Sequence, residues 1–236
     1  MKILTGTSGY GYKEWKGNFY PETLTADKML DFYALRLPTV EINNTFYRMP
    51  TANVVLSWNK HVPARFIFAI KAPQIITHVK RLEDVKEETR YFFKTISTLG
   101  KKLGPVLFQF PGGFRQNLPL LEDFLKLVPP QSLCAFIFRN KSWFNEKTYR
   151  LLGKGKFCLG LEDTDEEPIQ DIVGTAPWGY LRLRRADYSD AGLSQWAEKI
   201  LGQKWKKAYV FFKHEDDAAA RGPMLAESFN KLVSGL

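Results

Sequence analysis

The chain has 236 residues, 44% of them hydrophobic, which allows a large buried core and lies near the low end for a single β/α barrel. Lys and Arg number 34 against 25 Asp and Glu, and the resulting net charge of +9 favours acidic partners such as nucleic acid or phosphorylated metabolites. The two cysteines, the three histidines and the lack of any run of ~18 apolar residues exclude a disulfide framework and a membrane span, and argue against a metal cluster.

Eight short apolar segments recur along the chain, and nearly every one ends in a polar or charged residue. In order they read ILTGTSGY, TVEINNTF, FIFAIKAP, VLFQFPGG, AFIFRNKS, CLGLEDTD, GYLRLRRA and YVFFKHED. Because helix-like stretches separate them, the pattern predicts an α/β fold, a TIM-type (β/α)8 barrel, forming one domain over residues 1–236. The first strand begins at Ile3, which leaves no room for a signal peptide, so we expect a cytoplasmic protein without a membrane partner.

Apolar residues at helical spacing mark several of the connections between these strands. The predicted helices cover 30–37 before Pro38, 85–96 closed by Gly100, 118–128 capped by Asn117, 193–201 and 225–232. The weakest helical signal is DEEPIQDIVG, so we expect the helix after the sixth strand to be short or missing. Cys134 and Cys158 lie inside predicted strands and are interpreted as reduced core thiols.

Side chains alternate along each strand, and this alternation sorts them into two faces. In TVEIN, Val40 and Ile42 fall on one face and Glu41 and Asn43 on the other. If the apolar members meet the helices, the polar members point into the upper barrel. The predicted inward set is Glu41, Asn43, Lys71, Gln109, Arg139 and Arg182, and in the last strand either Lys213 or His214 turns inward.

This inward set contains more cations than carboxylates. Glu41 is its one carboxylate and cannot neutralise three cations, even if Asp163 or Glu162 supplies a second. Buried charges are costly unless they are paired or solvated, so a bound anion would satisfy the surplus. The planar fork of arginine suits this role, because it holds phosphate or carboxylate in two parallel bonds. The alternative is a structural salt-bridge network across the barrel mouth.

Six segments resemble, in order, the motifs of the domain of unknown function 72 family, the YecE-like proteins. They are GTSGYGYKEWKGNFYP, VEINNTFYRMP, FAIKAPQIITH, LGPVLFQFPGGF, FRNKSWF and YVFFKHED, and the resemblance runs from Thr5 to about Ala226. It implies a TIM-type barrel but supplies no reaction, because the family has no established activity. The family's recurrent polar positions correspond here to Ser8, Tyr10, Trp15, Glu41, Asn43, Thr45, Phe46, Tyr47, Lys71, Thr77, His78, Gln109, Pro111, Arg139, Ser142, Trp143 and Arg182.

One position departs from the family pattern. The resemblance implies a Glu two residues before the arginine of the fifth-strand motif, where this chain has Ile137. If that Glu takes part in acid–base chemistry, this member is altered or inactive. If it only balances charge, the site of this member is more cationic than that of its relatives.

The catalytic candidates are Glu41, His78 and Tyr47. Glu41 is predicted to act as a general acid or base, or to serve only as a counter-ion, because neighbouring cations and burial shift a carboxyl pKa in opposite directions. His78 and Tyr47 are expected to assist from the loops above the strands. Lys71 could form a Schiff base, although anion binding is the favoured role.

The candidates for substrate binding are Ser8, Tyr10, Asn43, Lys71, Gln109, Arg139, Trp143 and Arg182. The aromatic members could stack on a base or sugar, or could simply pack in the core. A metal site built from His78, His214, Glu41 and Asp163 is disfavoured by the surrounding cations. We therefore expect no metal and no cofactor.

These observations lead to one hypothesis and two alternatives. The hypothesis is an enzyme, a hydrolase, isomerase or lyase, that acts on a small phosphorylated or carboxylated substrate at the C-terminal mouth of the barrel. A nucleic-acid-binding or nucleic-acid-processing protein is the first alternative, because surplus positive charge is interleaved with aromatic residues. A non-catalytic ligand sensor is the second alternative, because Ile137 stands where the resemblance implies a Glu. The sequence predicts no oligomeric state.

Overall fold

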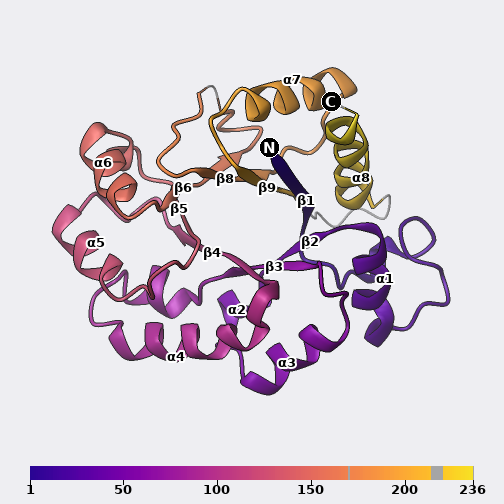
Figure 1. Ribbon diagram of the computed structural model, residues 1–236, viewed down its shortest axis with the longest axis horizontal. Helices are drawn as coiled ribbons and strands as arrows, with labels where there is room; N and C mark the ends of the chain where they lie inside the picture. Colours follow the sequence, from indigo (N-terminus) through magenta and orange to yellow (C-terminus); the bar gives the residue numbers. More distant parts are fainter. Residues whose placement is uncertain (170, 214–219, 236) are drawn as a thin grey trace.

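The strands of the protein form a single parallel sheet that curves into a nearly closed barrel (Figure 1). The structure, a computed structural model, describes residues 1–169, 171–213 and 220–235. The strands are β1 (Lys2–Ser8), β2 (Thr39–Ile42), β3 (Ile67–Lys71), β4 (Leu103–Phe110), β5 (Cys134–Phe138), β6 (Cys158–Leu159), β7 (Leu161–Asp163), β8 (Trp178–Leu183) and β9 (Lys207–Phe212). Their order is β6-β5-β4-β3-β2-β1-β9-β8-β7.

The two ends of this order are halves of one predicted strand. Only Gly160 separates β6, which pairs with β5, from β7, which pairs with β8. The Gly160 amide donates to the Phe136 carbonyl at 2.9 Å, and a Cβ on Gly160 would lie 2.7 Å from Ile137 Cγ1. Glycine therefore lets the chain pass close to β5 while it transfers its pairing to β8. The predicted TIM-type barrel is confirmed, with its sixth strand divided in two.

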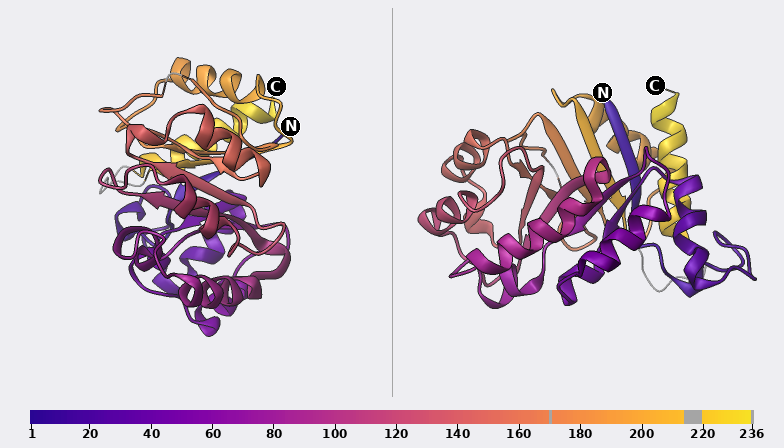
Figure 2. Two further views of the ribbon diagram at one scale, coloured as in Figure 1. Left: turned by 90° about the vertical axis from the view of Figure 1, so that its left-hand side faces the viewer. Right: turned by 60° about the horizontal axis from the view of Figure 1, so that its bottom comes forward.

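Helices surround the sheet, as the views in Figures 1 and 2 show. They are α1 (Met29–Arg36), α2 (Asn44–Tyr47), α3 (Ala52–Lys60), α4 (Lys86–Ile96), α5 (Leu118–Leu125), α6 (Glu146–Lys154), α7 (Asp190–Leu201) and α8 (Arg221–Ser234). Further helical turns are η1 (Lys13–Trp15), η2 (Ala26–Lys28), η3 (Ile75–Val79), η4 (Ser97–Lys102) and η5 (Lys141–Trp143). None of the described helices has both the length and the apolarity required to span a bilayer.

The helices agree with the periodicity of the sequence, with three additions, of which α2 is a single turn that follows β2. The five predicted helices correspond to α1, α4, α5, α7 and α8, and the Asn117 side chain caps α5 by accepting from the Leu120 amide. The other two additions, α3 and α6, bury only one and two residues respectively, so their apolar stripe is weak in the sequence. The described residues 164–169 and 171–177 contain no helix, as expected for the connection after the sixth strand.

Two apolar layers, one on each side of the sheet, stabilise the barrel. Val40, Ile42 and Phe68 belong to the large layer between the strands and the helices. The inner layer fills the barrel and consists of Leu4, Ala69, Leu107, Ala135, Ile137, Cys158, Trp178, Tyr180, Tyr209 and Phe211. This division confirms the predicted alternation, and both cysteines are buried free thiols. The polar strand ends therefore lie above a closed apolar floor.

Candidate functional site

Glu41 and Arg182 form a buried ion pair at the carboxyl ends of the strands. The Glu41 side chain is fully buried; its Oε2 accepts from the Tyr180 hydroxyl at 2.6 Å and its Oε1 from Arg182 Nη2 at 3.0 Å. Burial alone would raise the pKa of Glu41, but Arg182, Tyr180, Lys71 and Ser8 outweigh it and lower this pKa from 4.5 to about 2. Glu41 is therefore a firmly held carboxylate at neutral pH.

Glu162 on β7 connects this pair to the rest of the site. It is the register partner of Arg182, whose Nη1 donates to Glu162 Oε1 at 2.5 Å. Arg184 Nε lies 3.3 Å from the same oxygen, while Oε2 accepts from Gln109 Nε2 at 2.7 Å and from Arg139 Nη2 at 3.3 Å. Burial opposes ionisation here too, yet the three guanidinium groups lower the pKa of Glu162. One carboxylate thus holds three arginines together.

Lys71 completes the network, and no carboxylate among the described residues is its partner. Its Nζ donates to Gln109 Oε1 at 2.7 Å and lies 4.3 Å from the centre of the Phe46 ring, and no ion pair joins it to a carboxylate in the part of the chain that the structure describes. Burial and the charges of Arg182 and Arg184 lower the pKa of Lys71 to about 8, against the opposing effect of the two glutamates.

The network carries more positive than negative charge. Among the described residues that these bonds connect, four cations (Lys71, Arg139, Arg182 and Arg184) face two carboxylates. Asp163 does not reduce this surplus, because its side chain points to the other face of the strand. There it is buried and accepts from Tyr188 at 2.8 Å and from Arg185 at 2.9 Å.

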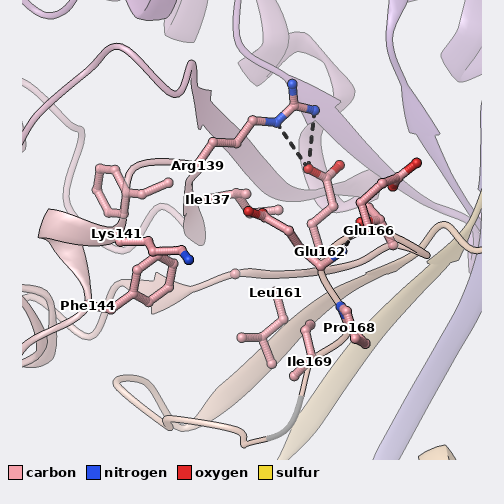
Figure 3. Close-up of a pocket in the computed structure, with 13 residues that line it drawn as sticks. Ile137, Arg139, Lys141, Phe144, Leu161, Glu162, Glu166, Pro168 and Ile169 are labelled. Atoms are coloured by element: carbon pink, nitrogen blue, oxygen red, sulfur yellow. Dashed lines mark hydrogen bonds and ion pairs between the residues drawn. The ribbon is translucent and has the colours of Figure 1, made fainter.

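A pocket of about 830 Å³ adjoins the network. Arg139 and Glu162 belong to the network and also line the pocket. The loop after β5 and the loop after β7 both line it, and the described residues of the second loop contain no helix. In Figure 3, Lys141 and Phe144 lie on one side of the pocket and Glu166 on the other. Ile137 contributes to an apolar wall. A ligand in this pocket could therefore contact Arg139, whose side chain is 53% exposed.

Two of the catalytic candidates lie near Phe46. His78 packs edge-on against the Phe46 ring at 4.9 Å, and its Nδ1 shares a 2.9 Å hydrogen bond with the Thr77 hydroxyl. Burial, together with Lys71, Arg139 and Arg81, lowers the pKa of His78, so the ring is mostly neutral at pH 7. Tyr47 also packs on Phe46 and is 74% exposed.

The remaining candidates lie apart from this network or support it. Ser8 is buried beside Glu41, its register partner. Tyr10 and Asn43 line a second, smaller pocket of about 240 Å³. Trp143 lies in the core: it is fully buried, its indole donates to the Phe114 carbonyl at 2.7 Å, and it stacks on a neighbouring ring. We therefore leave Trp143 out of the ligand site.

Sequence reasoning missed Tyr180, and it placed Arg184 on the same face as Arg182 without including it in the inward set. Tyr180 and Arg184 both lie on the inward face of the seventh predicted strand, where Arg182 was expected, so the alternation of side chains contained the signal. Lys213 follows β9 and its amide donates to the Leu183 carbonyl, whereas His214 lies outside the described residues. Within residues 1–169, 171–213 and 220–235, no three His, Cys, Asp or Glu side chains gather in a way that could hold a metal ion.

Comparisons with known proteins agree with the architecture. The UPF0759 protein YunF of Bacillus subtilis strain 168 is 29% identical over 279 aligned positions, covering 99% of this chain and 97% of that protein. The UPF0759 protein YecE of Escherichia coli K12 is 33% identical over 116 positions, covering 49% of this chain and 43% of its own.

Solved structures show the same barrel. A DUF72 family protein from Thermotoga maritima MSB8 has a TM-score of 0.84 at 28% identity, covering 99% of this chain and 100% of that one. A second, from Enterococcus faecalis V583, has a TM-score of 0.80 at 20% identity, covers 98% of this chain and 95% of its own, and shows the shared fold alone. The family model described as protein of unknown function DUF72 matches residues 4–235, and the chain belongs to that family.

Proposed function

We propose that the chain is an enzyme that binds a small phosphorylated or carboxylated substrate at the C-terminal mouth of the barrel and acts on it as a hydrolase, isomerase or lyase. The surplus of two cations in a largely buried network supports this proposal most strongly. A charge that none of the described protein groups balances favours an anionic ligand. The adjoining pocket supplies the necessary space.

The geometry suggests different roles for the cations. Both terminal nitrogens of Arg182 are already bound to carboxylates, and the side chain is 3% exposed, so we assign it to positioning Glu41 and Glu162. Arg139 and Arg184 make longer contacts of 3.3 Å to Glu162 and are more exposed. They can turn toward a ligand at little cost, and their forks suit phosphate or carboxylate.

Proton transfer is better assigned to Lys71 and His78 than to Glu41. A carboxylate with a pKa of about 2 is a weak base at neutral pH, and both of its oxygens already accept hydrogen bonds. Lys71 has a pKa of about 8, and the mostly neutral His78 can accept a proton. Tyr47 remains a candidate for contact with the substrate because of its exposed position at the mouth.

A thermal-shift screen with phosphosugars, nucleotides and organic acids, each with and without chelator, tests the proposal. A ligand that binds the folded chain and not the unfolded chain raises the free energy of unfolding by mass action, by about 2.7 kcal/mol at a ligand concentration of one hundred times Kd. The melting temperature rises accordingly. The R139A variant should abolish the shift, while R150A, which removes an exposed arginine on α6, should preserve it. An undiminished shift in R139A would contradict the assignment of the mouth, and a ligand that binds without any turnover would favour the sensor.

A further inference from the structure

We propose that Lys71 is a nucleophilic amine that forms an imine with the carbonyl carbon of an aldehyde or ketone bearing an anionic group. The inference deepens the proposed function, because the anionic group would be held by the arginines of the same mouth. It also narrows the reaction, since an imine promotes lyase or isomerase chemistry at carbon and not hydrolysis of a phosphate ester.

The surroundings of Lys71 differ from those of other lysines in the chain. Lys80 Nζ lies 2.7 Å from a Glu88 carboxylate, which raises its pKa and keeps it protonated. Lys102 Nζ donates to the carbonyl oxygens of Asn59 and Val62, at 2.6 and 2.7 Å, and serves a structural role. Lys71 has one neutral acceptor, Gln109, and the face of an aromatic ring. An amine held in this way can lose its proton without breaking an ion pair.

The neighbouring charges act in the same direction. Arg182 and Arg184 disfavour a third positive charge nearby, and burial adds to their effect, so the pKa of Lys71 falls to about 8. In roughly a tenth of the molecules the Lys71 amine is then unprotonated at pH 7, a far larger fraction than for a lysine with an ordinary pKa near 10.4. Lys71 also lies at the carboxyl end of β3, the end of a barrel strand at which substrates bind.

The chemical step balances without an added oxidant or reductant. The unprotonated amine attacks the carbonyl carbon, forming a carbon–nitrogen bond, and the carbonyl oxygen leaves as water after it gains two protons, one from the amine and one from solvent. His78 packs against the same Phe46 ring as Lys71, and we assign to it the exchange of a proton with the carbinolamine oxygen. The protonated imine then accepts the electron pair of a bond to the neighbouring carbon as that bond breaks, and yields an enamine. In an isomerase the broken bond is C–H and its proton goes to a base; in a lyase it is C–C, and the other carbon leaves as an aldehyde after its hydroxyl gives up a proton.

The amide of Gln109 links this centre to the negative charge of the site. Its Oε1 accepts from Lys71 and its Nε2 donates to Glu162, each at 2.7 Å. The Gln109 side chain is buried, and the hydrogen bonds to Lys71 and Glu162 hold the orientation of its amide. It can therefore keep Nζ in place while no carboxylate of the described residues contacts Lys71 directly.

Reductive trapping tests the inference on the full chain. Wild-type protein is incubated separately with pyruvate, glyoxylate, dihydroxyacetone phosphate and the neutral glycolaldehyde, in the presence of sodium cyanoborohydride, and adducts are mapped by peptide mass spectrometry. We expect at least one anionic probe to modify Lys71 at least tenfold more than Lys102, with the yield rising between pH 7 and pH 9. Equal modification of Lys71 and Lys102, or no adduct on Lys71, would overturn the inference.

Two variants provide matched controls. K71R should remove the adduct, whereas K102R should retain it, and circular dichroism melting checks that both fold. Because the ratio of Lys71 to Lys102 is read in the wild-type chain, the test stands even if K71R does not fold. A ligand-induced thermal shift without an adduct on Lys71 would refute the imine and leave the anion site intact. An adduct formed equally well from glycolaldehyde would support the amine and count against the anion site.

Discussion

Replacing Glu41 with glutamine should change how the stability of the protein depends on pH. Folding lowers the pKa of Glu41 from 4.5 to about 2, so the ionised side chain stabilises the folded state at pH values above about 4.5. This contribution disappears as the pH falls toward 2. At about 1.36 kcal/mol per pH unit, the ionised form accounts for about 3 kcal/mol at pH 7.

The same difference fixes the expected behaviour of the variant. The E41Q variant should be about 3 kcal/mol less stable than wild type at pH 7, within the range for breaking a buried ion pair. The gap should shrink by roughly 1.5 kcal/mol at pH 3.5, because wild type has lost part of the contribution that the variant never had.

Urea denaturation followed by circular dichroism at pH 7, 5 and 3.5 measures this gap directly. The matched control is E122Q, at an exposed position of α5, which should stay within about 0.5 kcal/mol of wild type at every pH. A gap between E41Q and wild type that is constant over this range would refute the reasoning, since it would mean that Glu41 does not titrate differently in the folded and unfolded chains.

Two further predictions concern the backbone and the alternative ligand. The G6A variant should lose at least about 3 kcal/mol of unfolding free energy or fail to fold, because a Cβ on Gly6 would lie 1.9 Å from the Thr39 carbonyl oxygen. The control G112A places its new atom more than 4 Å from any neighbour and should leave the stability measured by thermal melting unchanged. A Gly6 variant as stable as wild type would contradict this packing. The affinity for the small anion should fall only about tenfold or less between 50 and 200 mM salt, measured by calorimetry, whereas oligonucleotide binding that neutralises six to ten phosphates falls by about 10³ to 10⁵. A decline of that size for the physiological ligand would favour nucleic acid.

The sequence was sufficient to predict the barrel and most of the network, because period-two alternation has a fixed meaning in a strand. Lys71, Gln109 and Arg182 are polar residues on otherwise apolar inward faces, so their convergence follows once the strands form a barrel. Tyr180 does not stand out in this way from its apolar neighbours, since a tyrosine among apolar residues is usually a core residue. Its bond to Glu41 depends on two segments 139 residues apart.

The distribution of charge could not be predicted from the sequence alone. The alternation of β7 places Glu162 inward and Asp163 outward, but only the distances show that Glu162 binds three arginines while Lys71 is left with Gln109. The division of the sixth strand at Gly160 was equally hidden, because it depends on how closely Ile137 approaches from β5. Pairing and proximity are properties of the folded chain and have no periodic signature.

Locating a bound anion tests the central claim most directly. Crystals of the wild-type protein soaked in selenate would show the anion by anomalous scattering. We predict selenate at the mouth, within hydrogen-bond distance of Arg139 and of Lys71 or Arg184, and its loss from that position in R139A. Selenate bound only at exposed lysines elsewhere, with the mouth free of it, would contradict the claim that the network holds an unbalanced positive charge.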